Sequence, residues 1–213
     1  MIWAGLVLAA ALATALYLAA IDLLGRALGL RTEAVTLGAG PRLLDIGIGA
    51  ARYRVALFPF MGSVTFADGD IDRLPALKRA AIEIAGVAAS CLGALLLLGP
   101  AAGELVFATV KNLLSMMVLR TDPVDLWRAT RHVLETAPPL DLLGRTLAVN
   151  AGSNLMPFPL LASVGTLLAL IEAATGWKPG LNLRQRLNQI GLAAWLWCLL
   201  LLAIGGVRFF LGR

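Results

Sequence analysis

The chain has 213 residues, of which 59% are hydrophobic and only 15% are charged. Soluble domains usually contain about a quarter charged residues, so the composition predicts a single integral membrane domain over residues 1–213. The net charge is +5, but the basic residues are scattered between apolar runs without interleaved aromatic residues, which argues against nucleic acid as a partner. One histidine and two cysteines also argue against a histidine-ligated metal centre.

The first apolar run, residues 2–24, is long enough to cross a bilayer as a helix. It lacks the basic start of a secretory signal, and its apolar stretch is longer than the usual signal core. We therefore interpret it as a retained first span, with a cleaved signal as the alternative.

Residues 33–68 change from a helical to a strand-like pattern. Short β-branched or aromatic runs are interrupted by glycine and proline, which is typical of short strands joined by tight turns. The stretch is moderately apolar but too interrupted to span. It predicts a small sheet or β-hairpin at, or dipping into, one membrane face, provided that its backbone polar groups are paired or shielded.

A second span is predicted for residues 80–99, and it carries Glu83 near its start. Residues 105–137 are mixed in character. They predict an interfacial helix followed by a solvent-exposed helix that begins near Pro123. The single histidine, His132, falls on this last helix beside arginines, so we expect it on a solvated face.

The third apolar segment, residues 140–175, is broken in its middle. Pro157 and Pro159 prevent an uninterrupted α-helix, and Asn150 and Asn154 stand just before them. Irregular backbone at membrane depth is tolerated only where protein or a watery cavity receives it, so the break predicts a binding site. The alternative is that the amide side chains only join helices.

A fourth span is predicted for residues 189–210. The whole pattern predicts an all-α membrane bundle of about four transmembrane helices, with a small membrane-associated β-hairpin between the first two and a broken third helix. Basic residues concentrate in the loops 26–79 and 178–186. By the positive-inside rule, this places the N-terminus outside and the strand-rich loop in the cytoplasm.

The broken segment also resembles a known signature. Residues 154–164 read NLMPFPLLASV and lead into an apolar helix. The string resembles the third-helix signature of the site-2 protease family of intramembrane zinc metalloproteases, which runs approximately N-L-x-P-x-P-x-L-D-G-G. Four further stretches, residues 28–41, 52–66, 77–90 and 186–197, also resemble the family. They match in order the segment after its first active-site helix, its β-hairpin, the start of its second helix and its last helix.

The same match implies that the family's metal site is lost. The zinc-binding H-E-x-x-H falls on residues 17–21, with Tyr17 and Ile21 at the histidine positions and Leu18 at the catalytic glutamate. The aspartate that supplies the third ligand falls on Ala162. We therefore expect no catalytic residue, no metal and no other cofactor, and we interpret the chain as a pseudoprotease.

The resemblance also covers the elements with which the family binds its client helix. In the family, the asparagine that matches Asn154 and the hairpin that matches residues 58–66 hold a client helix in an extended form, through an amide clamp and an edge strand. The implied partner-binding residues are Asn150, Asn154, Pro157, Pro159, Phe60, Gly62 and Val64.

The implied partner is a transmembrane protein within the lipid bilayer, and the implied location is the bacterial cytoplasmic (inner) membrane. The alternative is a structural accessory subunit of a larger membrane complex, which binds through lipid-facing helix surfaces. Trp3, Trp195 and Trp197 are large anchors available for either role. An active intramembrane metalloprotease is the least favoured interpretation.

Overall fold

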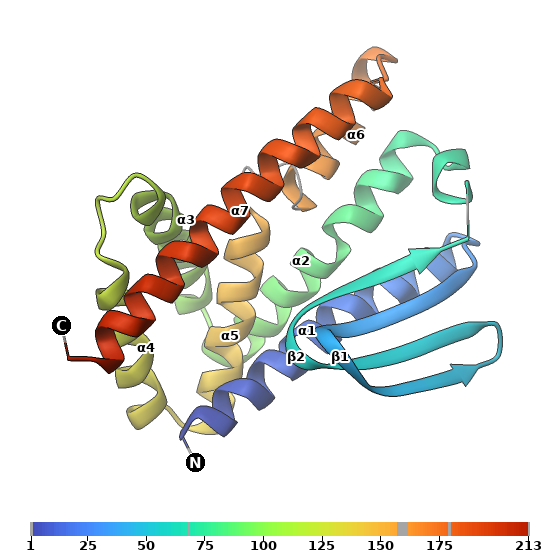
Figure 1. Cartoon of the computed structure of the whole chain (residues 1–213). Coiled ribbons are helices and arrows are strands. Elements are labelled where there is room, and N and C mark those ends of the chain that lie inside the picture. The colour runs from blue at the N-terminus through green and yellow to red at the C-terminus, as the bar shows by residue number, and fades with distance from the viewer. Residues whose placement is uncertain (1, 68, 157–161, 179, 213) are drawn as a thin grey trace.

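The structure, a computed structural model, describes residues 2–67, 69–156, 162–178 and 180–212, with the backbone alone at residues 2, 60, 72, 162, 163 and 181. It is mainly helical, with a two-stranded antiparallel sheet after the first helix (Figure 1). In chain order the elements are α1 (Ile2–Ala27), β1 (Thr32–Ile48), β2 (Ala51–Phe66), the short 3-10 helix η1 (Ile71–Arg73), α2 (Ala76–Leu98), α3 (Ala101–Met117), α4 (Pro123–Thr136), α5 (Pro139–Asn154), α6 (Ala162–Thr175) and α7 (Leu181–Phe210).

Three of the described helices, α1, α2 and α7, are long and apolar enough to cross a membrane. The prediction of a helical membrane protein with a small sheet is confirmed in this form. The expected third span, residues 140–175, is divided between α5 and α6, which have 16 and 14 residues. Because about 20 residues are needed to span, neither helix crosses alone, and the expected count of about four spans is not confirmed.

The helices α1, α2 and α5 pack together around small side chains. Ala13 of α1, Ala94 of α2 and Ala148 of α5 are buried almost completely. Side chains of this size let helix backbones approach closely, which is how apolar helices associate where no water is present to drive them together. Helix α6 packs against α2, and helix α3 packs against α5.

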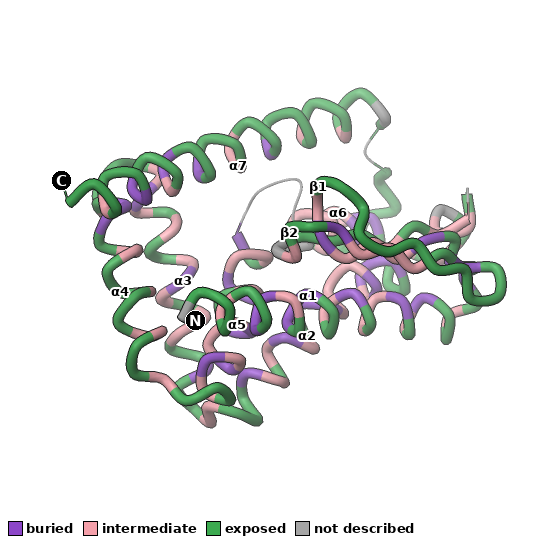
Figure 2. Tube along the Cα trace, turned by 60° about the horizontal axis from the view of Figure 1, so that its bottom comes forward, coloured by how far each residue is buried: buried purple, intermediate pink, exposed green. Residues whose placement is uncertain are grey.

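The last helix, α7, packs mainly on α3 and α4 rather than on α1 and α2. Its buried side contributes Cys198 and Leu201 to a cluster with Met116 and Met156. Figure 2 shows α7 as an outer helix with exposed residues along most of its length. These exposed residues are largely apolar, as is suitable for a helix that faces lipid.

Both strands bend, so that the start of β1 lies between two parts of β2. Val35 pairs with Val64 on one side and with Tyr53 on the other, while Ile46 in the later part of β1 also pairs with Tyr53. Residues 58–66 of β2 pair with β1 alone. Within the described part of the chain, the other side of residues 58–66, called here the edge segment, is therefore an open sheet edge.

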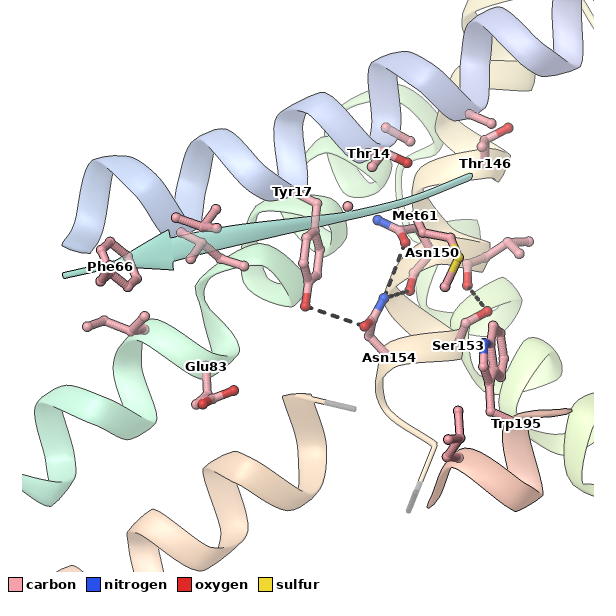
Figure 3. A pocket seen from close by; sticks show the side chains of 18 of the residues that line it. Thr14, Tyr17, Met61, Phe66, Glu83, Thr146, Asn150, Ser153, Asn154 and Trp195 are labelled. Carbon is pink, nitrogen blue, oxygen red and sulfur yellow. Dashed lines mark hydrogen bonds between the residues drawn. The ribbon is translucent and has the colours of Figure 1, made fainter. Parts of the chain in front are cut away.

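The edge segment runs beside α1 (Figure 3). The hydroxyl of Thr14 donates a hydrogen bond of 3.1 Å to the carbonyl of Pro59, and Thr14 stands near the middle of the candidate span Trp3–Ala27. A Cβ on Gly62 would come within 2.5 Å of the Leu18 side chain, so strand and helix are in close contact. The strand therefore lies at the level of the middle of α1.

A buried carboxylate joins the end of α1 to the sheet. Asp22 accepts a hydrogen bond of 2.6 Å from the Thr32 hydroxyl and one of 3.0 Å from Nε of Arg26. Arg26 also donates through Nη2 to the hydroxyl of Tyr53 at 2.6 Å. The start of β1 and the start of β2 are thus both attached to the last turns of α1.

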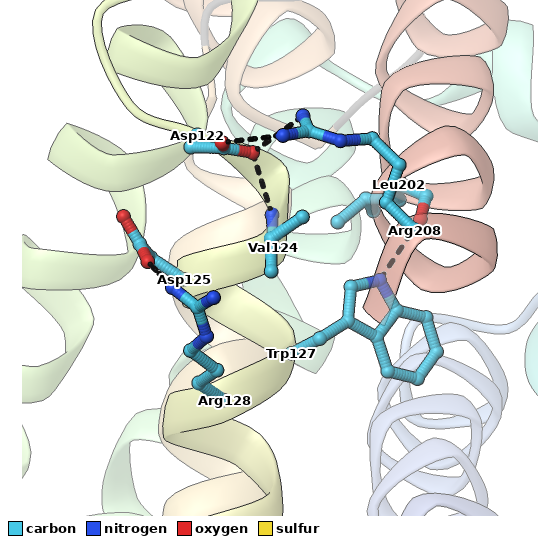
Figure 4. A network of polar contacts seen from close by, with 7 residues as sticks. All are labelled: Asp122, Val124, Asp125, Trp127, Arg128, Leu202 and Arg208. Carbon is cyan, nitrogen blue, oxygen red and sulfur yellow. Dashed lines mark hydrogen bonds and ion pairs between the residues drawn. The ribbon is translucent and has the colours of Figure 1, made fainter. Parts of the chain in front are cut away.

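At the opposite end, α4 is joined to the end of α7. Asp122 caps α4 by accepting a 3.0 Å hydrogen bond from the backbone N–H of Val124, and it accepts two more, each of 3.1 Å, from Arg208 (Figure 4). Trp127 donates through its indole N–H to the carbonyl of Leu202 at 2.9 Å. Together these contacts fix the short amphipathic helix against the membrane-spanning one.

The expected solvent-exposed helix corresponds to α4, and Asp122 and Pro123 form its start. His132 is exposed on α4, as the sequence predicts. It therefore lies on a helix surface that faces away from the packed interior.

The Asp122 contacts predict a pH dependence. The backbone N–H of Val124, followed by the Arg208 guanidinium, holds the pKa of Asp122 below its ordinary value. The folded state is therefore favoured by this carboxylate above the ordinary pKa of about 4, and the contribution is lost as the pH falls through the lowered value. Thermal unfolding in detergent should show a smaller acid-induced fall in Tm for Asp122→Asn than for the wild type, because asparagine still caps but does not titrate.

The matched control is Asp125→Asn on the same helix. Asp125 pairs with Arg128 on the exposed side of α4, so its ion pair stays within that helix and does not reach α7 (Figure 4). This variant should retain the acid sensitivity of the wild type. Equal acid sensitivity in Asp122→Asn and the wild type would contradict the assigned role of Asp122.

Candidate functional site

A pocket of about 650 Å³ lies between α1, α2, α5, α7 and the edge segment of β2 (Figure 3). Pockets of a few hundred to about a thousand Å³ are typical of ligand-binding sites. The walls are mostly apolar, and hydroxyl, amide and carboxyl groups project from three of the helices. The pocket therefore combines an apolar enclosure with a small number of groups able to form hydrogen bonds.

A chain of hydrogen bonds crosses the pocket from α1 to α2. The hydroxyl of Tyr17 donates to Oδ1 of Asn154 at 3.4 Å, and Nδ2 of Asn154 donates to the carbonyl and to Oδ1 of Asn150 at 2.9 and 3.2 Å. Nδ2 of Asn150 donates to Oγ of Ser90, which is fully buried, at 3.2 Å. The amide groups of α5 are therefore held in fixed orientations at the end of that helix.

Tyr17 and Gly86 fit each other as a pair. A Cβ at position 86 would lie 2.5 Å from the Tyr17 ring, which is closer than any real contact between these atoms. The glycine on α2 therefore leaves the space that the aromatic ring occupies. Tyr17 itself is the residue that the family resemblance aligns with the first histidine ligand.

The four positions that the sequence resemblance aligns with the family's active-site residues have different places in the structure. Tyr17 and Ile21, one turn apart on α1, both line the pocket, whereas the buried Leu18 packs toward Gly62 of β2. Ala162 begins α6, and its side chain lies outside the described residues. Within the described ranges, no three His, Cys, Asp or Glu side chains converge in a way that would hold a metal ion.

Four of the predicted partner-binding residues come together at the pocket, from α5 and from the edge segment: Asn150, Asn154, Gly62 and Val64. The side chain of Phe60 and the whole of Pro157 and Pro159 lie outside the described residues. Residues about 90 positions apart in the sequence are thus adjacent in space.

Sequence reasoning assigned no site role to several residues that line the pocket, among them Thr14, Glu83 and Leu192. The sequence left open whether Trp195 serves the cleft or a lipid-facing surface, and in the structure its side chain is half-buried and lines the pocket. Since α7 is apolar all round, its pattern does not reveal which face turns inward. For Glu83 a signal was present, namely a carboxylate in an otherwise apolar span.

Comparison with known proteins adds no family. No protein-family model matches the sequence, and no curated protein matches it at a significant level. The resemblance to site-2 proteases therefore rests on the quoted motifs, and the function is inferred from the pocket.

The fit of Tyr17 to Gly86 can be tested by adding one methyl group. Gly86→Ala should lower the free energy of unfolding by about 1–3 kcal/mol, because the new Cβ overpacks against the ring. The measurement is thermal unfolding in detergent. Combining it with Tyr17→Leu should cost less than the sum of the two single changes, because the smaller side chain frees the space.

The control for this prediction is Gly103→Ala in α3. A Cβ at position 103 would meet no atom within 4 Å, so this change should be neutral or slightly stabilising in a helix. A Gly86→Ala protein as stable as the wild type would show that the ring does not need the glycine.

Proposed function

We propose that this chain is a site-2-protease-like membrane protein that does not cut, but binds a transmembrane partner held in an extended form. Two observations on the edge segment support this most directly: one of its sides has no strand partner in the described part of the chain, and it lines the pocket through Met61, Gly62, Val64 and Phe66. The oriented amide of Asn154 lines the same pocket.

An open strand edge suits this role for a physical reason. Backbone N–H and C=O groups at membrane depth find no water, and each unpaired group costs several kcal/mol. The Thr14 hydroxyl donates a hydrogen bond to one carbonyl of the edge segment, that of Pro59. An incoming extended segment would pair with the others by strand addition, while the pocket receives its alternate side chains.

The binding role is favoured over proteolysis by the residues at the family's active-site positions. A phenol and two aliphatic side chains, those of Tyr17, Leu18 and Ile21, replace two ligands and the base. The serines near the pocket are also engaged, since Ser153 donates to the carbonyl of Val149 and Ser90 accepts from Asn150. Neither histidine nor lysine is among the described residues that line the pocket, so Ser153 has neither of these bases beside it there.

The charge distribution supports an orientation with the N-terminus outside. Basic residues gather where α1 ends and where α2 and α7 begin, and several pair there with acids, as Arg31 and Arg73 do with Asp70 and Lys178 does with Glu172. By the positive-inside rule this end faces the cytoplasm. With the family resemblance, the proposed location is the bacterial inner membrane.

The accessory-subunit function has one observation in its favour, the exposed apolar face of α7. Ile190, Leu196 and Val207 are each more than half exposed on this helix. Contact with lipid accounts for such a face equally well, whereas lipid does not satisfy an open strand edge. The pocket is therefore the preferred binding surface.

Photo-crosslinking in native membranes separates these two functions. A crosslinking amino acid at Val64 or Ser153, both at the pocket, should capture a discrete membrane protein. The matched positions Leu196 and Val207, on the exposed side of α7, should give only lipid adducts. Capture from the α7 positions alone would favour the accessory subunit and remove the pocket as the partner site.

Metal analysis tests the absence of a catalytic zinc centre. Protein purified without chelators, with any histidine tag removed, should contain about 0.1 zinc per chain or less after equilibration with zinc and desalting. His132→Ala should give the same value, because this exposed imidazole belongs to no group of three or more potential ligands in the described part of the chain. A content near one zinc per chain would show that the chain has assembled a metal site from other residues.

A further inference from the structure

Glu83 is the one carboxylate among the described residues that line the pocket, and these residues include no basic side chain. It stands seven residues after Ala76, the first residue of α2, or about 10 Å along the helix axis. Its carboxyl group lies against α6, where a Cβ on Gly165 would come within 2.9 Å of Oε2. The side chain projects toward the space beside Tyr17 and Asn154 (Figure 3).

Glu83 differs from the hydroxyl and amide side chains of the pocket in its hydrogen bonding. Every hydroxyl and amide side chain that lines the pocket has a partner within the chain: Thr14, Tyr17, Thr146, Asn150, Ser153 and Asn154. For Glu83, the described part of the chain provides neither a hydrogen bond nor an ion pair. The hydroxyl and amide groups of the pocket thus have hydrogen-bond partners within the chain, whereas its one carboxylate has none among the described residues.

The basic residue nearest along the helix is engaged elsewhere. Arg79, one turn before Glu83, forms an ion pair with Glu172 of α6, and Lys178 approaches the same carboxylate at 3.4 Å. These cations therefore accompany Glu172. An acid left without such a partner inside a membrane domain is costly, and acids in this position usually pair with a charge of opposite sign.

We propose that the extended segment bound in the pocket carries a lysine or arginine that forms an ion pair with Glu83. This inference rests on the proposed function and adds the chemistry of the partner. A strand paired with the edge segment turns alternate side chains toward the pocket, and the long stem of a basic residue can reach an acid located one-third of the way along the span. Glu83 is then the residue that selects the partner, whereas the strand edge binds any extended backbone.

The test uses full-length protein in phosphatidylcholine vesicles, which carry no net charge that would attract a basic peptide. The probes are synthetic single-span peptides of about 20 residues with a glycine-proline break. They differ only at one residue in the broken segment, which is lysine, leucine or glutamate. Capture is measured as energy transfer between labelled peptide and labelled protein, and the readout is the ratio of the affinities for two probes.

For the wild type we expect the lysine probe to bind about tenfold more tightly than the leucine probe, as one charged hydrogen bond supplies, and the glutamate probe to bind least. Glu83→Gln should reduce the lysine-to-leucine ratio to about one. The matched control Glu104→Gln removes an exposed acid of α3, outside the pocket, and should keep the wild-type ratio. The wild-type protein alone already gives the order of affinities for the three probes, so the test does not depend on whether the variant folds.

Two outcomes would overturn the inference. The first leaves the proposed function intact, and the second does not. If the lysine and leucine probes bind equally to the wild type, and Asn154→Leu weakens both, the partner is held as proposed but Glu83 does not select it. If no probe binds above protein-free vesicles, or if Asn154→Leu changes nothing, the pocket does not bind extended segments. The proposed function then fails together with the role of Glu83.

Discussion

A backbone polar group inside a bilayer has to find its hydrogen-bond partner in protein, and the arrangement around the pocket depends on this constraint. The edge segment of β2 runs at the level of the middle of α1, where Thr14 binds the carbonyl of Pro59. At the end of α5, the side chain of Asn154 takes the carbonyl of Asn150. Side chains therefore satisfy some exposed backbone groups, and those of the open strand edge are the ones that we propose a bound segment pairs with.

The same region is held together by packing and hydrogen bonds between three helices. The ring of Tyr17 on α1 occupies the space left by Gly86 on α2. The Tyr17 hydroxyl begins a chain of hydrogen-bonded amides that ends at the buried Ser90. Such a chain joins α1, α5 and α2 without any charged group. A network in which each member is satisfied is rigid, so this network helps the pocket to keep its shape.

Charges are arranged around this apolar zone in paired form. Asp22 with Arg26 joins α1 to the sheet, Arg79 with Glu172 joins α2 to α6, and Asp122 with Arg208 joins α4 to α7. Each of these acids has a cation beside it, which is how charged groups are tolerated next to a membrane. Glu83 stands apart from this pattern, and its place in the pocket makes it the natural contact for a charge brought by a partner.

The sequence alone determined the membrane class, the strand-rich stretch and the broken third segment, because apolar length, strand-like runs and proline act locally along the chain. It also indicated that Asn150, Asn154 and the hairpin belong to one site, through motifs that resemble a family. Only the tertiary structure decided which face of α7 turns inward, and hence that Trp195 lines the pocket. It also decided that Glu83 lacks a partner within the described residues while Asp22 has two, since pairing depends on which helices pack together and local sequence does not encode that.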